Sequence, residues 1–239
     1  MSVALPLFPL STALFPGLVL PLRVFEDRYR SLVRHLMEAP DGTPREFGVV
    51  SIRRGWEVEP IASGPAGDPR GPVAATAPVT LYEVGCSAEL RQVTEREDGE
   101  FEIVTVGRRR FRVTEVDATT APYLTAQVEW LPEPLGEPGL ADTLAPGVLA
   151  VFQRYLRRIR AQNQVDGEQL PDEPTVLSYL VAATASLTPE DRQRLLEVPD
   201  TATRLRTERR ILSREVALLS QVRAVPVPLA DLAIPSSPN

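Results

Sequence analysis

Residues 5–37 read LPLFPLSTALFPGLVLPLRVFEDRYRSLVRHLM, and the hydrophobic period changes within this stretch. Val3–Phe8 and Leu18–Val24 have the short apolar runs typical of strands. Between them, Phe15-Pro16-Gly17 supplies turn chemistry, because proline fixes φ and the following glycine permits a positive φ. The pattern then predicts a helix over Phe25–Glu38, with acidic residues in its first turn, where the helix dipole favours negative charge.

One face of this helix carries its apolar residues at spacings of three and four, which is the period of a half-buried helix. The residues on this face are Tyr29, Leu32, Val33, Leu36 and Met37. The sole histidine, His35, lies well round the helix from them, among polar residues. We therefore expect His35 to be a solvated residue of the helix surface.

The following residues predict further strands and one strong hairpin. Asp98-Gly99 is a hairpin signal between two strand-like runs, whereas Ile61–Thr80 is rich in Gly, Pro and Ala and predicts a long loop. The expected strands are Phe47–Arg53, Tyr82–Glu95, Glu100–Val106, Arg108–Val116 and Tyr123–Leu131. About six strands with one inserted helix fit a small, partly closed barrel.

Beyond the proline-rich connector Leu131–Gly139 the period becomes helical. The expected helices are Leu140–Gln162, Thr175–Ser186, a short one capped by Thr188, and Thr201–Val222. Leucines at 205, 212 and 219 fit a coiled-coil seam or, by preference, one side of a small bundle. The sequence thus predicts an α+β chain with a barrel domain at 1–132, a helical bundle at 140–223 and a disordered tail at 224–239.

Composition excludes several classes of catalytic site. Of 239 residues, 43% are hydrophobic and 24% charged, which is typical of a soluble globular protein, and the net charge of −6 argues against a broad polyanion-binding surface. The chain has no lysine, so neither a Walker A loop nor a Ser-Lys dyad can be built from it. Cys86 is its sole cysteine and is expected to be a small buried residue. No catalytic, metal or cofactor site is predicted.

The first 22 residues carry no charged side chain, so a membrane or export segment has to be considered. Pro6, Pro9, Pro16 and Pro21 interrupt any helix there, and no basic segment precedes the apolar run. We therefore expect a cytoplasmic protein with no membrane contact.

Three blocks of this sequence resemble the substrate-binding (N-terminal) domain of the Lon proteases. The first is the opening with its FPG turn, the second is LYEVGCSAEL from Leu81 with DGEFEIVTVGRRRFRV from Asp98, and the third is LTPEDRQRLLEVPDTATRL from Leu187. The resemblance implies a PUA-like barrel that binds exposed hydrophobic segments of unfolded or damaged polypeptides. Since the lysine-dependent ATPase and peptidase modules of Lon are missing, it implies a stand-alone, non-enzymatic binder. Such a binder acts as an adaptor or chaperone-like protein, alone or with a protease encoded on another chain.

A polypeptide-binding groove needs apolar walls and polar edges. The candidate lining residues are aromatic residues near strand ends and two polar neighbours, namely Phe25, Trp56, Tyr82, Phe111, Arg23 and Glu83. Trp56 is expected to be the most exposed of the aromatic residues, whereas burial is the favoured expectation for Phe25 and Phe111.

Two alternatives remain open at this point. Arg108–Arg112 interleaves basic residues with Phe111, as in single-stranded nucleic-acid binding, and PUA-like barrels occur in RNA-modifying proteins. Strand alternation would divide these arginines between two faces, and the acidic hairpin around Asp98 would offset their charge, so RNA binding is the less favoured function. The other alternative is a small-molecule or degron reader, as in the cereblon relatives of this barrel.

Overall fold

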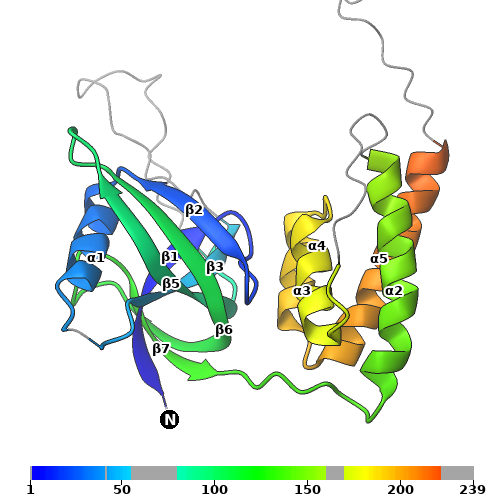
Figure 1. Cartoon of the computed structure of the whole chain (residues 1–239). Coiled ribbons are helices and arrows are strands. Elements are labelled where there is room, and N and C mark those ends of the chain that lie inside the picture. Colours follow the sequence, from blue (N-terminus) through cyan, green and yellow to red (C-terminus); the bar gives the residue numbers. More distant parts are fainter. Residues whose placement is uncertain (1, 41, 55–79, 160–169, 222–239) are drawn as a thin grey trace, which may run out of the picture.

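The structure is a computed structural model that describes residues 2–40, 42–54, 80–159 and 170–221. The strands and one helix make up one part of the molecule, the other helices make up the second part, and an extended connection joins the two (Figure 1). The strands are β1 (Val3–Leu10), β2 (Val19–Val24), β3 (Glu46–Arg54), β4 (Thr80–Leu81), β5 (Val84–Glu95), β6 (Phe101–Asp117) and β7 (Thr125–Trp130). The helices are α1 (Asp27–Met37), α2 (Leu140–Ile159), α3 (Pro174–Thr184), α4 (Pro189–Glu197) and α5 (Thr201–Gln221).

The sheet closes on itself through its first strand. β1 pairs in parallel with β3 and antiparallel with β7, so the order β1-β7-β6-β5-β3 returns to β1. β2 and β4 lie outside this ring, where β2 pairs with β6 and β4 with β3. The sheet is mostly antiparallel, and β2 is added to the long strand β6. With its five described helices the fold is mixed α+β.

The Phe15-Pro16-Gly17 turn rests directly on β6. Gly17 has a φ of +81°, as the sequence predicted, and its N–H donates to the carbonyl of Gly107 at 2.8 Å. A Cβ on Gly107 would lie 2.2 Å from the carbonyl oxygen of Phe15. The sequence predicted a bend at Gly107 and a separate strand after it. β6 instead runs as one strand from Phe101 to Asp117, although its pairing with β5 shifts register directly after Gly107. The glycine instead permits this close approach.

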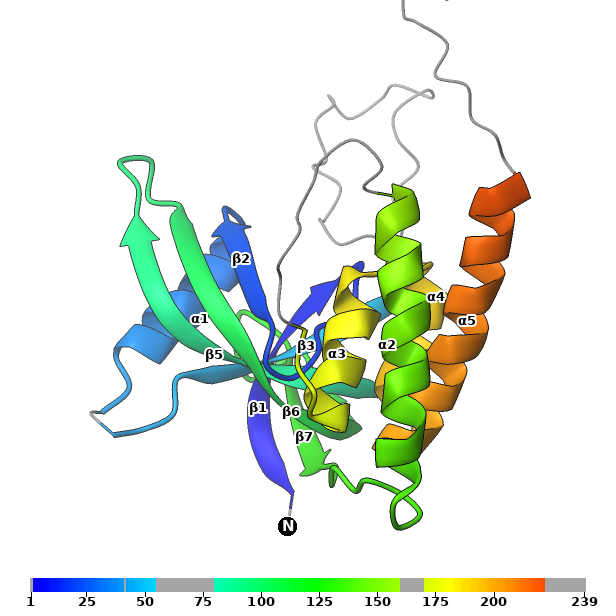
Figure 2. The same cartoon turned by 45° about the vertical axis from the view of Figure 1, so that its right-hand side comes forward.

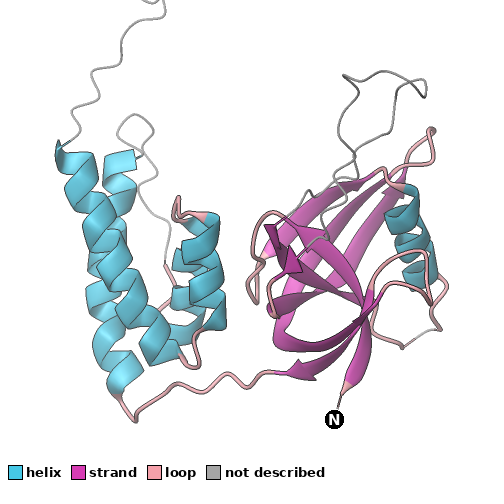
Figure 3. Ribbon diagram, turned by 180° about the vertical axis from the view of Figure 1, so that it is seen from behind, coloured by secondary structure: helices cyan, strands magenta, loops and turns pink. Residues whose placement is uncertain are grey.

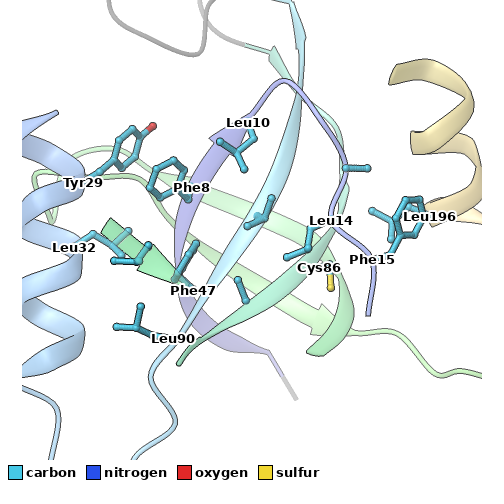
Figure 4. Packing of buried hydrophobic residues seen from close by; sticks show 14 of the residues in the cluster. Phe8, Leu10, Leu14, Phe15, Tyr29, Leu32, Phe47, Cys86, Leu90 and Leu196 are labelled. Carbon is cyan, nitrogen blue, oxygen red and sulfur yellow. The ribbon is translucent and has the colours of Figure 1, made fainter. Parts of the chain in front are cut away.

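A continuous apolar cluster runs from α1 across the strands to the helical part (Figure 4). Phe8 stacks on Tyr29 of α1, with ring centroids 4.0 Å apart, and at the other end Phe15 lies beside Leu196 of α4. Tyr29, Leu32, Val33 and Leu36 form the buried face of α1. Met37 was expected on this face but is 44% exposed.

The four remaining helices pack on one another beside the ring, on the side away from α1 (Figures 1 and 3). Thr188 caps α4 by accepting from the Asp191 N–H, and Pro189 occupies the first turn, as the sequence predicted. Leu205 and Leu212 are buried within the helical part, whereas Leu219 is 37% exposed. Two of the three heptad leucines therefore serve the packing of the helices within this chain.

A buried arginine joins the ring to the helices. Arg110 of β6 is 1% exposed, and its guanidinium donates to the carbonyls of Leu196 and Val198, both at 2.7 Å. It also donates to the carbonyl of Pro132 at 3.1 Å and forms an ion pair with Glu133 at 2.6 Å. We call this set the Arg110 junction. It fixes the end of α4 and the connector after β7 against β6.

A second buried arginine supports the Arg110 junction from the helical side. Arg204 of α5 donates to the carbonyl of Leu195 at 3.1 Å and to Ser178 Oγ at 3.2 Å. Its guanidinium lies 4.0 Å from the ring centroid of Tyr179, whose hydroxyl donates to Glu133. Burial lowers the pKa of Arg204 and raises that of Tyr179, because it disfavours the charged form of each side chain. The hydrogen bonds and contacts described above offset the cost of burying the Arg204 charge.

Candidate functional site

Two surface hollows lie next to β2, one at each half of the strand. β2 itself runs beside β6 (Figure 2). The first has a volume of about 160 Å³ and lies between the β1–β2 connection, the start of β2 and helices α3 and α4. It is lined by Thr12, Ala13, Leu14, Phe15, Leu18, Val19, Leu20, Ala183 and Arg192. The second has a volume of about 320 Å³ and is lined by Pro21, Leu22, Arg23, Gln92, Thr94, Glu102, Ile103 and Val104. We call β2, Phe25 directly after it and both hollows the β2 surface.

The residues of β2 alternate between solvent and core. Val19 is 64% exposed, Pro21 and Arg23 are also exposed, and Val24 is buried. Phe25, directly after the strand, is 47% exposed. The expectation that Phe25 is buried is therefore wrong, because it lies between the end of β2 and the start of α1, outside the buried face of either element. Exposed apolar residues thus lie along β2 at Val19 and Pro21 and directly after it at Phe25, with the charged Arg23 between Pro21 and Phe25. Exposed apolar residues grouped in this way are typical of surfaces that contact another molecule.

Ion pairs border the β2 surface at the β5–β6 hairpin. Arg23 donates to the Glu100 carboxylate at 2.6 Å, and this hydrogen bond raises the pKa of Arg23. Arg96 pairs with Glu102. Arg23 lines the second hollow and is held by Glu100 of the β5–β6 hairpin. Its predicted role as a polar edge of a binding groove stays a prediction that this position suits.

Tyr82 and Glu83 line a different depression, which shares no residue with the β2 surface. Its volume is about 710 Å³, and its other lining residues are Arg53, Thr80, Leu81, Val84, Arg112 and Glu197. Glu83 pairs with Arg112 at 3.4 Å. The structure therefore divides the predicted groove residues between two places rather than bringing them together.

Phe111 cannot line an accessible groove. It is 0% exposed inside the ring, where its ring meets that of Trp130 edge-on with centroids 6.3 Å apart. The structure thus corrects the inclusion of Phe111 among the candidate lining residues, for the reason that an aromatic side chain on the inner face of a closed ring fills its core. Trp56 lies outside the described residues.

The arginine run does not form one basic stripe. Arg108 pairs with Glu89 at 3.0 Å, Arg112 pairs with Glu83, and Arg110 is buried in the junction described above. Arg109 lies over the Trp130 ring at 3.7 Å from its centroid. Because each of these guanidiniums already has a partner, the run offers little free positive charge to a phosphate backbone.

Cys86 and His35, the two side chains best suited to covalent chemistry, do not line the β2 surface. Cys86 is 0% exposed, and burial raises the pKa of its thiol. The side chain therefore stays protonated, and a protonated thiol is a poor nucleophile. His35 is exposed beside Tyr123, 6.3 Å between ring centroids. Across the described part of the chain, no cluster of His, Cys, Asp and Glu has the geometry to hold a metal ion. No described helix is both long and apolar enough to cross a bilayer.

Sequence reasoning missed most of the β2 surface, including Val19, Leu20, Pro21 and Val104. One signal could have found it. A proline inside a strand pattern is confined to edges, to the first position of a strand or to bulges. Pro21, in the middle of a strand-like run, is therefore a local indication that β2 is an edge strand.

Comparison with known proteins places this arrangement in a family. A family model described as the ATP-dependent protease La (LON) substrate-binding domain matches residues 4–214. Lon protease 1 of Thermus thermophilus is 34% identical over 145 residues, which are 59% of this chain and 18% of that protein. Lon protease 2 of Herpetosiphon aurantiacus is 30% identical over 223 residues, 91% of this chain and 24% of that protein. The chain thus spans about a quarter or less of the length of these relatives.

Two solved structures share the fold. The Lon N-terminal domain protein from Xanthomonas campestris gives a TM-score of 0.55 at 24% identity and covers 88% of this chain and 98% of its own. The N-terminal domain of the Mycobacterium avium complex Lon protease gives a TM-score of 0.60 at 19% identity, with 90% and 98% covered. At these identities the likeness establishes the fold alone.

Proposed function

Since the chain belongs to the LON substrate-binding domain family, we propose that it binds exposed apolar segments of unfolded polypeptides and that the β2 surface is where it holds them. The observation that carries this proposal is the apolar track along β2, with Val19 and Phe25 exposed and a hollow at each half of the strand. The ring of strands accords with the PUA-like barrel that the sequence resemblance implies.

The size of the surface favours weak, transient capture. Each fully buried aliphatic or aromatic side chain contributes about 1.5–3 kcal/mol from removal of apolar area. Ordering of a flexible segment opposes this gain. Two or three anchoring side chains, less this ordering cost, then give dissociation constants of about micromolar or weaker. Such affinity suits a binder that samples many clients and releases them.

The proposal assigns no covalent chemistry to these 239 residues, because no lysine is present for a nucleotide-binding loop or a Ser-Lys dyad. In this role the chain presents clients as an adaptor or chaperone-like protein. The partner class that family membership suggests is a protease carried on another chain.

A binding titration at two ionic strengths tests the proposal. A permanently unfolded, fluorescently labelled model protein is titrated with the chain at low and at high salt, and a single-stranded RNA of similar length is titrated in parallel. Apolar capture is expected to change less than about threefold with salt, whereas a nucleic-acid contact weakens by orders of magnitude. Saturable RNA binding without capture of the unfolded protein would contradict the proposal.

A further inference from the structure

β2 has one paired edge and one open edge within the described part of the chain. Its single strand partner there is β6, in a register that sets Val19 against Val106 and Arg23 against Glu102. Just before the strand, the N–H of Gly107 donates to the carbonyl of Leu18 at 2.8 Å. The ring strands, by contrast, are paired on both sides.

The direction of each backbone group on β2 follows from that bond. Residues of an antiparallel strand alternate between exchanging hydrogen bonds with the partner and pointing away from it. Because Leu18 bonds to β6, residues 20, 22 and 24 do so as well, and Val19, Pro21 and Arg23 direct their backbone groups outward. The open edge therefore offers the N–H groups of Val19 and Arg23 and three carbonyls. Pro21 has no N–H to offer.

This edge has limited protection against pairing. Edge strands are commonly blocked by charged side chains, by proline or by cover from another element. Arg23 is the sole charged residue of β2, and Glu100 holds its side chain toward the β5–β6 hairpin. Pro21 removes one donor, which weakens but does not abolish pairing. A strand added here would therefore bind and leave readily.

We propose that an extended polypeptide segment binds the open edge of β2 as an added strand and extends apolar side chains across β2 toward the two hollows, the second of which continues over β6 and β5. This inference rests on the proposed function and specifies its mode, in which main-chain hydrogen bonds give affinity and alternate side chains give selectivity. A rise of about 3.3 Å per residue makes the six residues of β2 a track about 20 Å long, enough for a segment of about six residues.

Charge at the hairpin end selects the segment further. Glu95, Glu97 and Asp98 are exposed around the β5–β6 turn, next to the end of β2 where Arg23 meets Glu100. Arg23 and Arg96 offset the charges of Glu100 and Glu102, which leaves the three turn carboxylates in excess. A segment with a basic residue at this end fits the surface better than one with an acidic residue, mainly through faster association.

Peptides with methylated backbone nitrogens test strand addition. The probe is a labelled peptide of alternating valine and threonine with an arginine at one end, made in two variants with N-methyl groups on odd or on even residues. Because a ladder uses alternate N–H groups, one variant is expected to lose about tenfold in affinity and the other less than about twofold. Equal loss in both variants overturns the inference.

Two substitutions at Val19 test the same edge from the protein side. Val19→Pro removes the outward N–H at the first residue of β2, a position where proline is tolerated, and leaves the bonds to β6 intact. Val19→Ala keeps the N–H and removes most of the side chain. Strand addition predicts that Val19→Pro weakens binding of the unmethylated peptide at least as much as Val19→Ala, with unchanged circular dichroism. Wild-type affinity in Val19→Pro contradicts it.

Two further readouts separate the alternatives. Exchange of the peptide's arginine for glutamate is expected to weaken binding severalfold at low salt, and an unchanged affinity removes the charge preference. Concentration-dependent dimers of the free chain that Val19→Pro abolishes would show that a second copy occupies the edge, which overturns the inference. If the unfolded protein of the preceding section is not bound, the proposed function itself fails. If it is bound but methylation has no register dependence, only the strand-addition mode fails.

Discussion

Replacement of Arg110 by alanine tests how the strands and helices are held together. The side chain is almost fully buried and its guanidinium contacts the carbonyls of Leu196, Val198 and Pro132 as well as the Glu133 carboxylate. Arg110→Ala leaves these acceptors without their donor and opens a cavity between β6 and α4. We therefore expect the helical part to lose much of its hold on the ring.

The expected loss can be sized from the contacts. Removing one partner of a buried, hydrogen-bonded ion pair costs about 3–5 kcal/mol. The lower end applies here, because Glu133 is 33% exposed and keeps the Tyr179 hydroxyl and Arg204 as partners. With a urea dependence of about 2 kcal/mol/M, a loss of about 3 kcal/mol lowers the unfolding midpoint by about 1.5 M.

Urea unfolding followed by far-ultraviolet circular dichroism measures this change. Arg112→Ala is the matched control, since Arg112 lies two residues along the same strand, is about half exposed and meets Glu83 at 3.4 Å. Surface pairs of this kind contribute about 0–1 kcal/mol, so the control midpoint should move by less than about 0.5 M. Equal midpoints for the two variants would refute the role given to the Arg110 junction.

Three other substitutions probe the turn, the helical core and the β2 surface. Gly107→Ala should destabilise the fold by at least about 2 kcal/mol, because the added Cβ would lie 2.2 Å from the Phe15 carbonyl oxygen. Gly147→Ala, with open space around the residue in α2, should stabilise the fold by up to about 1 kcal/mol. Thermal melts measure both changes, and equal melting temperatures would contradict the close approach at Gly107. Burial raises the pKa of Glu208 above its ordinary 4.5, so the folded state holds the proton longer than the unfolded state and the unfolding free energy falls as pH rises above 4.5. Glu208→Gln should flatten that slope in urea titrations at several pH values, and a wild-type slope would show that Glu208 is not its source. Phe25→Ser should weaken capture of the unfolded protein severalfold with little change in stability, because Phe25 is 47% exposed, and undiminished capture would remove it from the surface.

The local elements could be predicted because their signals are local. Gly17 adopts the positive φ that its place after Phe15-Pro16 indicated, and Gly99 at the predicted hairpin has a φ of +76°. The α1 face was found from its spacing, apart from Met37, which lies at the last position of the helix. Period and turn chemistry depend on neighbours within a few residues, so a single sequence contains them.

The candidate site was harder to predict because it depends on long-range pairing. Tyr82 and Glu83 looked like neighbours of Arg23, yet closure of the ring places them beside a different depression from the one that Arg23 lines. Arg110 looked like an exposed member of a basic run, and its burial depends on contacts with residues 86 and 88 positions further along the chain. Alternation along one strand cannot reveal which second layer covers its outer face.

The double pairing of β1 has a consequence for vectorial synthesis. This strand leaves the ribosome before the other described strands, but Val3 pairs with Val128 and Leu5 with Ala126. The ring therefore stays open until β7 has left the exit tunnel, and the apolar inner faces of the earlier strands remain accessible to water during that interval. A nascent chain of this protein thus exposes, for a time, the same kind of extended apolar segment that the folded protein is proposed to bind.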